Sequence, residues 1–343
     1  MTQEDDPKSK ESNALVKRTS KGLMTSKGRR GQISLTTDII RAAAIARTSS
    51  QALVDESWMH NIWDWADKLE DADSNAIPRD KEGLLTLYQI TLWARKLTEL
   101  PKRIGQLSNL DWISLDYNKL TELPESIGEL KKLTKLSVMS NNLRKLPESI
   151  GGLNNLTQLR VSRNNLTELP ESIGGLKNLT ELMVGINNLN ELPESIGGLK
   201  NLTELMVSNN NIRELPESIA DLKSLTKLHV NSNNINELPN IIGKLSSLKV
   251  LHLSDNNLSE LPESIGELSN LTHLVLSKNN FRELPESIGK LSSLTYLNLS
   301  DNNISELPES IGELINLKSL YLEGNSFSDI PKNINQNRVK VTF

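Results

Sequence analysis

One 23-residue phrase, LPESIGGLKNLTELMVGINNLNE at residues 169–191, decides the fold of this chain. Versions of it fill the sequence on both sides, and twelve of the thirteen prolines mark their positions. These prolines fall at one unbroken interval of 23 residues, at Pro78, Pro101, Pro124, Pro147, Pro170, Pro193, Pro216, Pro239, Pro262, Pro285, Pro308 and Pro331. A fixed period of this length indicates an array of stacked structural repeats.

Each repeat carries its own secondary-structure signal. The pattern L-x-x-L-x-(L/V/I)-x-x-N-x-L recurs eleven times, and its alternation, as in Leu182 and Val184, has the period of a β-strand. The asparagine that follows, as at Asn187, can turn inward and satisfy backbone groups of the loop. Arg95 takes its place in the first repeat, so the sequence predicts an asparagine ladder that starts at Asn118. The proline then turns the chain onto a convex side of short helical or irregular turns.

These motifs resemble the leucine-rich repeat family in its 23-residue class, and the resemblance covers residues 78–331. The chain is similar in texture to intracellular Ras-group leucine-rich repeat proteins of eukaryotes and to the repeat domains of bacterial effectors delivered into host cells. The resemblance implies an α/β solenoid, a horseshoe with a parallel concave sheet of about eleven short strands and an N-terminal helical cap. Repeats of this kind are stable only when they stack on neighbours.

The repeats divide the chain into four parts. Residues 1–50 carry ten Lys and Arg against five Asp and Glu and contain no aromatic residue, so we expect a disordered, basic, Ser/Thr-rich tail. Residues 51–77 form the helical N-terminal cap in this interpretation, because Trp58 and Ile62 begin an apolar stripe at helical spacing. The repeats then occupy residues 78–331, and residues 332–343 form a C-terminal cap.

The basic tail has three interpretations. It is a solubilising segment, or a secretion signal of the kind found on bacterial effectors. Attachment to nucleic acid or a membrane through residues such as Arg29 and Arg30 is the third, although the basic residues form no single block. We expect the first interpretation to hold, and a cytoplasmic location follows from it. Translocation into a host cell by a bacterial secretion system is the alternative.

The composition argues against catalysis. The chain contains no cysteine, which excludes disulfides, thiolate metal sites and catalytic thiols. Its many serines, such as Ser172, belong to the repeated Glu-Ser-Ile-Gly phrase, which marks them as scaffold. No stretch approaches the ~20 apolar residues that a membrane-spanning helix needs. We therefore expect no enzymatic activity, no cofactor, no small-molecule substrate and no transmembrane segment.

The histidines raise the question of a metal site. His229 and His252 occupy one column on neighbouring predicted strands, whereas His273 is displaced diagonally by ~8 Å from ordinary strand geometry. No carboxylate or thiolate completes a zinc set around them. We therefore expect no metal site.

The two faces of the predicted solenoid differ in how much they vary. The convex side repeats glutamates on either side of the prolines, such as Glu168 and Glu171, and this solvated acidic ridge disfavours nucleic acid. The concave side changes from strand to strand. Its central outward position runs through Thr91, Ser114, Ser137, Arg160, Met183, Met206, His229, His252, Val275, Asn298 and Tyr321.

This variation locates the predicted binding surface. Exposed Trp, Tyr, Met and Arg dominate the energetics of protein interfaces, and the concave positions are rich in them. We expect the protein to be a monomer that acts as a non-catalytic scaffold or adaptor in intracellular signalling. Its partner is expected to be a protein of unknown identity. The alternative is a secreted bacterial effector that binds a host protein. The predicted partner-binding residues are Trp93, Trp112, Met139, Arg160, Met183, Met206, His229, His252, His273, Tyr296 and Tyr321.

Overall fold

A computed structural model describes residues 56–69, 76–327, 334 and 339–342. The tail predicted at residues 1–50 lies outside the described residues. The repeats belong to one compact unit, Ser57–Phe343.

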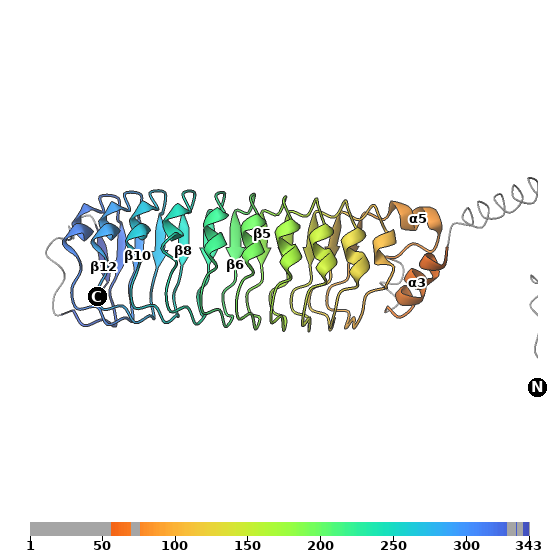
Figure 1. The fold of residues 1–343 in the computed structure, drawn as a ribbon. Coiled ribbons are helices and arrows are strands. Elements are labelled where there is room, and N and C mark those ends of the chain that lie inside the picture. Colours follow the sequence, from red (N-terminus) through yellow and green to blue (C-terminus); the bar gives the residue numbers. More distant parts are fainter. Residues whose placement is uncertain (1–55, 70–75, 328–333, 335–338, 343) are drawn as a thin grey trace, which may run out of the picture. The chain divides into compact units, whose positions relative to one another are not determined.

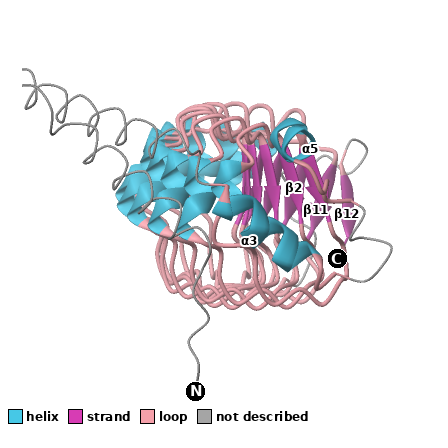
Figure 2. Ribbon diagram, turned by 90° about the vertical axis from the view of Figure 1, so that its right-hand side faces the viewer, coloured by secondary structure: helices cyan, strands magenta, loops and turns pink. Residues whose placement is uncertain are grey.

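Short parallel strands form a single sheet whose order follows the sequence, β1 to β12 (Figures 1 and 2). Neighbouring strands pair one repeat apart, so that Leu182 lies between Leu159 and Leu205. The strands are β1 Gln89–Thr91, β2 Trp112–Ser114, β3 Lys135–Ser137, β4 Gln158–Arg160, β5 Glu181–Met183, β6 Glu204–Met206, β7 Lys227–His229, β8 Val250–His252, β9 His273–Val275, β10 Tyr296–Asn298, β11 Ser319–Tyr321 and β12 Lys340–Thr342.

The parallel sheet and the repeat register confirm the predicted solenoid. The described strands number twelve, because β12 adds a strand beyond the last repeat and pairs with β11. Lys340–Thr342 carries no repeat phrase, so the repeat count could not predict it.

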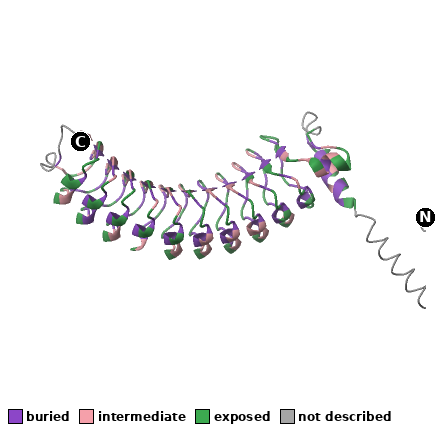
Figure 3. Cartoon of the chain, turned by 90° about the horizontal axis from the view of Figure 1, so that it is seen from above, coloured by how far each residue is buried: buried purple, intermediate pink, exposed green. Residues whose placement is uncertain are grey.

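A short 3-10 helix follows most of the repeat prolines. Pro170 holds φ at −66°, which suits the residue before a helix start, and the Leu176 amide closes the last turn on the Ile173 carbonyl. The 3-10 helices are η1 Ile104–Gln106, η2 Glu125–Glu129, η3 Glu148–Gly152, η4 Glu171–Gly175, η5 Glu194–Gly198, η6 Glu217–Asp221, η7 Ile242–Lys244, η8 Glu263–Glu267, η9 Glu286–Lys290 and η10 Glu309–Glu313. Seen from above, they line the outer side of a curve whose inner side is the sheet (Figure 3).

The core lies between the sheet and the 3-10 helices. Leu182 and Val184 are fully buried from the strand side, and Ile173 and Leu176 are fully buried from the convex side. The same positions are buried in neighbouring repeats, which makes one continuous aliphatic core. Burial of this stripe by adjacent repeats is the main source of stability for such a stack.

The predicted asparagine ladder is present. The Asn187 side-chain oxygen accepts from the Leu166 amide at 3.0 Å, and its nitrogen donates to the Val184 carbonyl at 2.9 Å. Asn118 begins the ladder by accepting from the amide of Leu97 at 3.0 Å, as the sequence predicts. These bonds satisfy loop groups that burial would otherwise leave without partners.

Two helices precede the first strand. α3 (Ser57–Ala66) buries an apolar face that includes Trp58, Ile62 and Trp65. The Trp65 indole nitrogen donates to the Glu99 carbonyl at 3.0 Å, so α3 contacts the first repeat. α5 (Lys81–Thr86) follows it, and Asp80 caps the start of α5 by accepting from the Gly83 amide at 2.7 Å.

Candidate partner-binding surface

The concave surface is built from the first and third residues of each strand, because the middle residue points into the core. The strands pair in register, so the third residues form one continuous column. In its central part this column consists of the half-buried residues Arg160, Met183, Met206, His229, His252 and Val275. Ser114 and Ser137 of the same column are buried, which removes them from the accessible surface.

Exposed aromatic side chains occupy the N-terminal end of the surface. Trp93 is 57% exposed and makes an edge contact with Tyr117, at 5.4 Å between ring centroids. Trp112 is 41% exposed. The sequence analysis did not select Tyr117, because it follows the strand and was not assigned to an outward column. Tyr117 directly precedes Asn118, the first residue of the asparagine ladder. The turn at this position recurs in every repeat, and this recurrence was the available signal.

Ion pairs occupy the next part of the surface. Arg160 binds Glu181 through its Nε at 2.7 Å, and Lys227 binds Glu204 at 3.1 Å. The hydrogen bond to Glu181 raises the pKa of Arg160 above its ordinary value. Arg160 therefore stays protonated and its charge is balanced by Glu181, so a partner would meet the Arg160–Glu181 ion pair and not an isolated cation.

A polar hollow of about 340 Å³ lies beside Arg160. Asp116 on its wall accepts from the Ser137 hydroxyl at 2.6 Å and from the Met139 amide at 2.7 Å. Met139 itself is half-buried. The hollow is lined by Trp112, Ser114, Asp116, Lys135, Leu136, Ser137, Gln158 and Arg160.

Methionines and histidines form the middle of the surface. Met183, Met206, His229 and His252 follow one another on the adjacent strands β5 to β8. The His229 and His252 rings make an edge contact at 5.8 Å between centroids. Burial lowers the pKa of both imidazoles, and the charge of His229 lowers that of His252 further. The Nε2 atom of His252 lies 2.8 Å from the Ser254 hydroxyl, which fixes the orientation of the ring.

Stacked rings form the C-terminal end. His273 stacks on Tyr296 at 5.6 Å with an interplanar angle of 21°, and Tyr296 contacts Tyr321 at 5.2 Å. Burial raises the pKa of Tyr296, and the neighbouring Tyr321 raises it further. His273 thus stacks on Tyr296, whereas His229 and His252 contact each other.

Ile186 adds an apolar side chain that the sequence analysis missed. It is 43% exposed and has a φ of 57°, in the left-handed region. A β-branched residue rarely adopts this conformation. Gly185 precedes it at the position where the neighbouring repeats carry Ser162 and Ser208.

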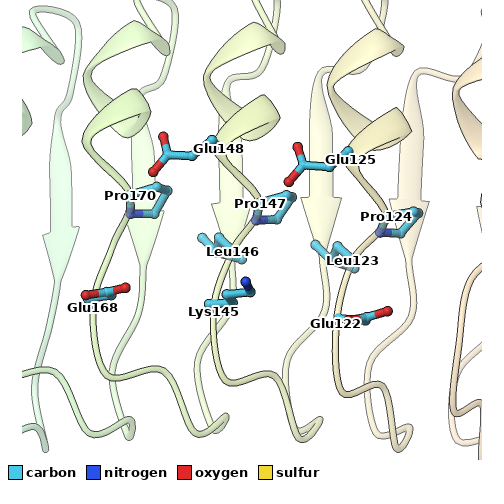
Figure 4. Close-up of a pocket in the computed structure, with 10 residues that line it drawn as sticks. All are labelled: Glu122, Leu123, Pro124, Glu125, Lys145, Leu146, Pro147, Glu148, Glu168 and Pro170. Atoms are coloured by element: carbon cyan, nitrogen blue, oxygen red, sulfur yellow. The ribbon is translucent and has the colours of Figure 1, made fainter.

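A second hollow, of about 360 Å³, lies on the convex side between three repeats (Figure 4). Its lining contains four glutamates and Lys145, and it consists mostly of the repeated Leu-Pro-Glu phrase. Some of these glutamates bond the next repeat, as when the Ser149 amide donates to Glu125 at 3.2 Å. The residues that line the convex hollow therefore mostly belong to the repeat phrase and recur in other repeats, so they do not distinguish this hollow from its neighbours.

The metal-binding and hydroxyl side chains of the described residues are placed as follows. Among them, no group of three or more His, Cys, Asp or Glu side chains is arranged to hold a metal ion. The repeated serines lie between neighbouring 3-10 helices, and the hydroxyls of Ser149, Ser172 and Ser195 are buried there. No helix in the described part of the chain is long and apolar enough to cross a membrane.

The geometry defines a class of protein: a solenoid of 23-residue repeats with a parallel sheet on its inner side. A leucine rich repeat model matches residues 86–143, 132–189 and 269–327. A leucine-rich repeat region model matches residues 184–251 and 228–295. The chain belongs to the leucine-rich repeat family.

Solved structures of similar proteins come from bacteria and plants. A leucine-rich repeat protein of Leptospira interrogans is 32% identical, with 78% of this chain and 87% of that chain covered and a TM-score of 0.50. The functional domain of InlJ from Listeria monocytogenes, which includes a cysteine ladder, is 28% identical, covers 73% of this chain and 51% of that one, and has a TM-score of 0.63.

A plant structure shows a similar repeat domain in a complex. The leucine-rich repeat ectodomain of the membrane receptor kinase GASSHO1/SCHENGEN3 from Arabidopsis thaliana, in complex with Casparian strip integrity factor 2, is 29% identical. It covers 74% of this chain and 35% of that chain, with a TM-score of 0.60. No curated protein sequence matches the chain. Leucine-rich repeat proteins are generally non-catalytic binding scaffolds, and their fold is typical of protein–protein interaction.

Proposed function

We propose that this protein is a non-catalytic scaffold or adaptor that holds a partner protein against its concave surface, in cytoplasmic signalling. One observation carries the proposal: the side chains that face outward from the sheet change from strand to strand, while the convex phrase barely changes. Residues that only maintain the stack are constrained by packing, whereas outward residues are free to differ. Variation confined to one face therefore supports recognition there.

The chemistry of the concave surface supports a protein partner. Trp93 and Tyr117 supply large apolar area at one end, and Tyr296 and Tyr321 supply it at the other. Aromatic residues and methionines are enriched at the centre of protein interfaces. Strands about 4.8 Å apart give the eleven repeat strands an arc of about 50 Å, which suits a folded domain or a long peptide.

The test is affinity capture with the full chain and a double variant, Arg160→Glu with Met183→Asp. The first change breaks the pair with Glu181 and places like charges together, and the second places a carboxylate in the methionine column. We expect the proteins captured by the parent chain to be reduced at least about tenfold, since loss of a few central contacts costs 2 kcal/mol or more.

A matched control makes the same charge changes elsewhere, with Lys145→Glu and Ile315→Asp. Lys145 lines the convex hollow, and Ile315 is an exposed residue just after η10. The control variant should capture the same proteins as the parent. Equal capture by all three proteins, or an equal loss of capture in both variants, would contradict a binding site on the concave surface.

The bacterial neighbours favour a second candidate function. Two of the similar solved structures belong to Leptospira and Listeria, and residues 1–50 are rich in Lys, Arg, Ser and Thr. In this alternative the protein is a secreted effector whose concave surface binds a host protein. A reporter fused to residues 1–50 and expressed in a bacterium with a secretion system should then appear outside the cell. Retention of the reporter would favour the cytoplasmic scaffold.

A further inference from the structure

A cluster of nitrogen and sulfur donors lies at the centre of the concave sheet. Met206, His229 and His252 are register partners on three adjacent strands, β6 to β8. Adjacent strands are about 4.8 Å apart, so side chains of one column can reach a common point above the sheet. All three side chains are half-buried, which holds them against the sheet while leaving one side open to small ligands.

The spacing of the two imidazole rings fits a shared metal ion. An ion about 2.0 Å from a ring nitrogen lies about 3.1 Å from the centroid of that ring. Two rings on one ion then have centroids about 5 to 6 Å apart, depending on the angle at the metal. The observed separation of the His229 and His252 centroids, 5.8 Å, falls in this range.

The donor set selects the type of metal. Thioether sulfur is a soft ligand that favours copper(I), and imidazole also suits copper. Hard cations need oxygen ligands, and zinc prefers four ligands drawn from thiolate, imidazole and carboxylate. Among the described residues no set of three or more His, Cys, Asp or Glu is placed for such a site. In the part of the chain that the structure describes, no carboxylate or thiolate joins the two histidines, but the thioether of Met206 is a further donor in the same column.

The hydrogen bond of His252 supplies the second feature of a metal site. Metal-binding histidines usually bond a neighbouring group through the nitrogen that does not bind the metal. The Nε2 atom of His252 lies 2.8 Å from the Ser254 hydroxyl. In the tautomer that donates from Nε2 to this hydroxyl, Nδ1 carries the free lone pair. His273 has no such place in the cluster, because it stacks on Tyr296.

We propose that Met206, His229 and His252 form a binding site for a soft monovalent metal ion of the copper(I) class, with one imidazole nitrogen from each histidine and the Met206 sulfur as ligands. Ser254 acts as a positioning residue that orients His252. The site lies within the proposed partner-binding surface but does not depend on it, because the ligands come from this chain alone.

The experiment titrates the full chain with silver(I), a soft ion that does not change its oxidation state, in chloride-free buffer, and follows binding by calorimetry. We expect one ion per chain. Since loss of a second-shell contact alone costs about 10- to 100-fold in metal affinity, His229→Gln and His252→Gln should each weaken binding at least tenfold. Met206→Leu should also weaken it, whereas His273→Gln and Met139→Leu serve as matched controls and should not.

A spectroscopic measurement on the unmodified chain tests the ligands even if a variant fails to fold. X-ray absorption at the silver edge of the unmodified chain should show nitrogen and sulfur together in the first shell. Equal affinity in the parent and in both histidine variants would overturn the proposal, as would an equal loss in the control variants. A first shell without sulfur, or zinc binding that equals silver binding, would overturn the assignment to a soft ion.

Discussion

At the scale of single residues, the left-handed turn after the strands includes one residue, Ile186, whose β-branched side chain disfavours that conformation. Its amide donates to the Ser208 carbonyl of the next repeat at 2.8 Å. Asn209 occupies the same place one repeat later with a φ of 57°, a conformation that asparagine tolerates well. Isoleucine does not, so the fold gives no reason for it. Its exposure supports a role in contact with the proposed partner.

Replacing Ile186 with asparagine tests whether the isoleucine side chain contributes to the stability of the fold. Ile186→Asn should raise the free energy of unfolding by about 1 kcal/mol, because the left-handed conformation costs an ordinary L-residue about 1–2 kcal/mol. Urea unfolding of the parent and the variant measures the change, with Asn209→Ile as the reverse substitution, which should destabilise. A lower stability of Ile186→Asn would show that packing of the isoleucine outweighs its backbone strain.

At the scale of elements, the sequence predicted the strands and the turns because the repeat phrase specifies both through burial. It could not predict how closely the 3-10 helices approach one another. A Cβ atom on Gly174 would lie 2.3 Å from the Ser195 carbonyl oxygen of the next repeat. Within the described residues, seven serine hydroxyls next to these glycines are buried without a hydrogen-bond partner: Ser149, Ser172, Ser195, Ser218, Ser264, Ser287 and Ser310. The close approach of neighbouring 3-10 helices therefore requires small side chains at these serine positions.

Substitution at the two positions should therefore have unequal effects. Gly174→Ala should lower the free energy of unfolding by about 2 kcal/mol, as overpacking of a well-filled interior does. Ser172→Ala removes only the hydroxyl and should leave stability unchanged or slightly higher. Thermal unfolding followed by circular dichroism measures both. Similar midpoints for Gly174→Ala and the parent would mean that the helices can move apart at low cost.

At the scale of the whole molecule, the convex side of the solenoid has nearly the same residues in every repeat, whereas the residues of the concave surface differ from strand to strand. The columns of that surface followed from the repeat register, which is why residues such as Arg160 and Met183 could be placed in advance. The contacts among them could not be predicted, because they depend on side-chain direction. Arg160 is paired with Glu181, and His273 stacks on Tyr296 while His229 and His252 contact each other.

The central claim is that a protein partner binds this inner surface, and site-specific photo-cross-linking tests it most directly. A benzoylphenylalanine side chain at position 183 points from the sheet, and the same group at position 145 lies in the convex hollow as a control. We predict a covalent adduct with the captured partner from position 183 and none from position 145. An adduct from position 145 alone would contradict the account.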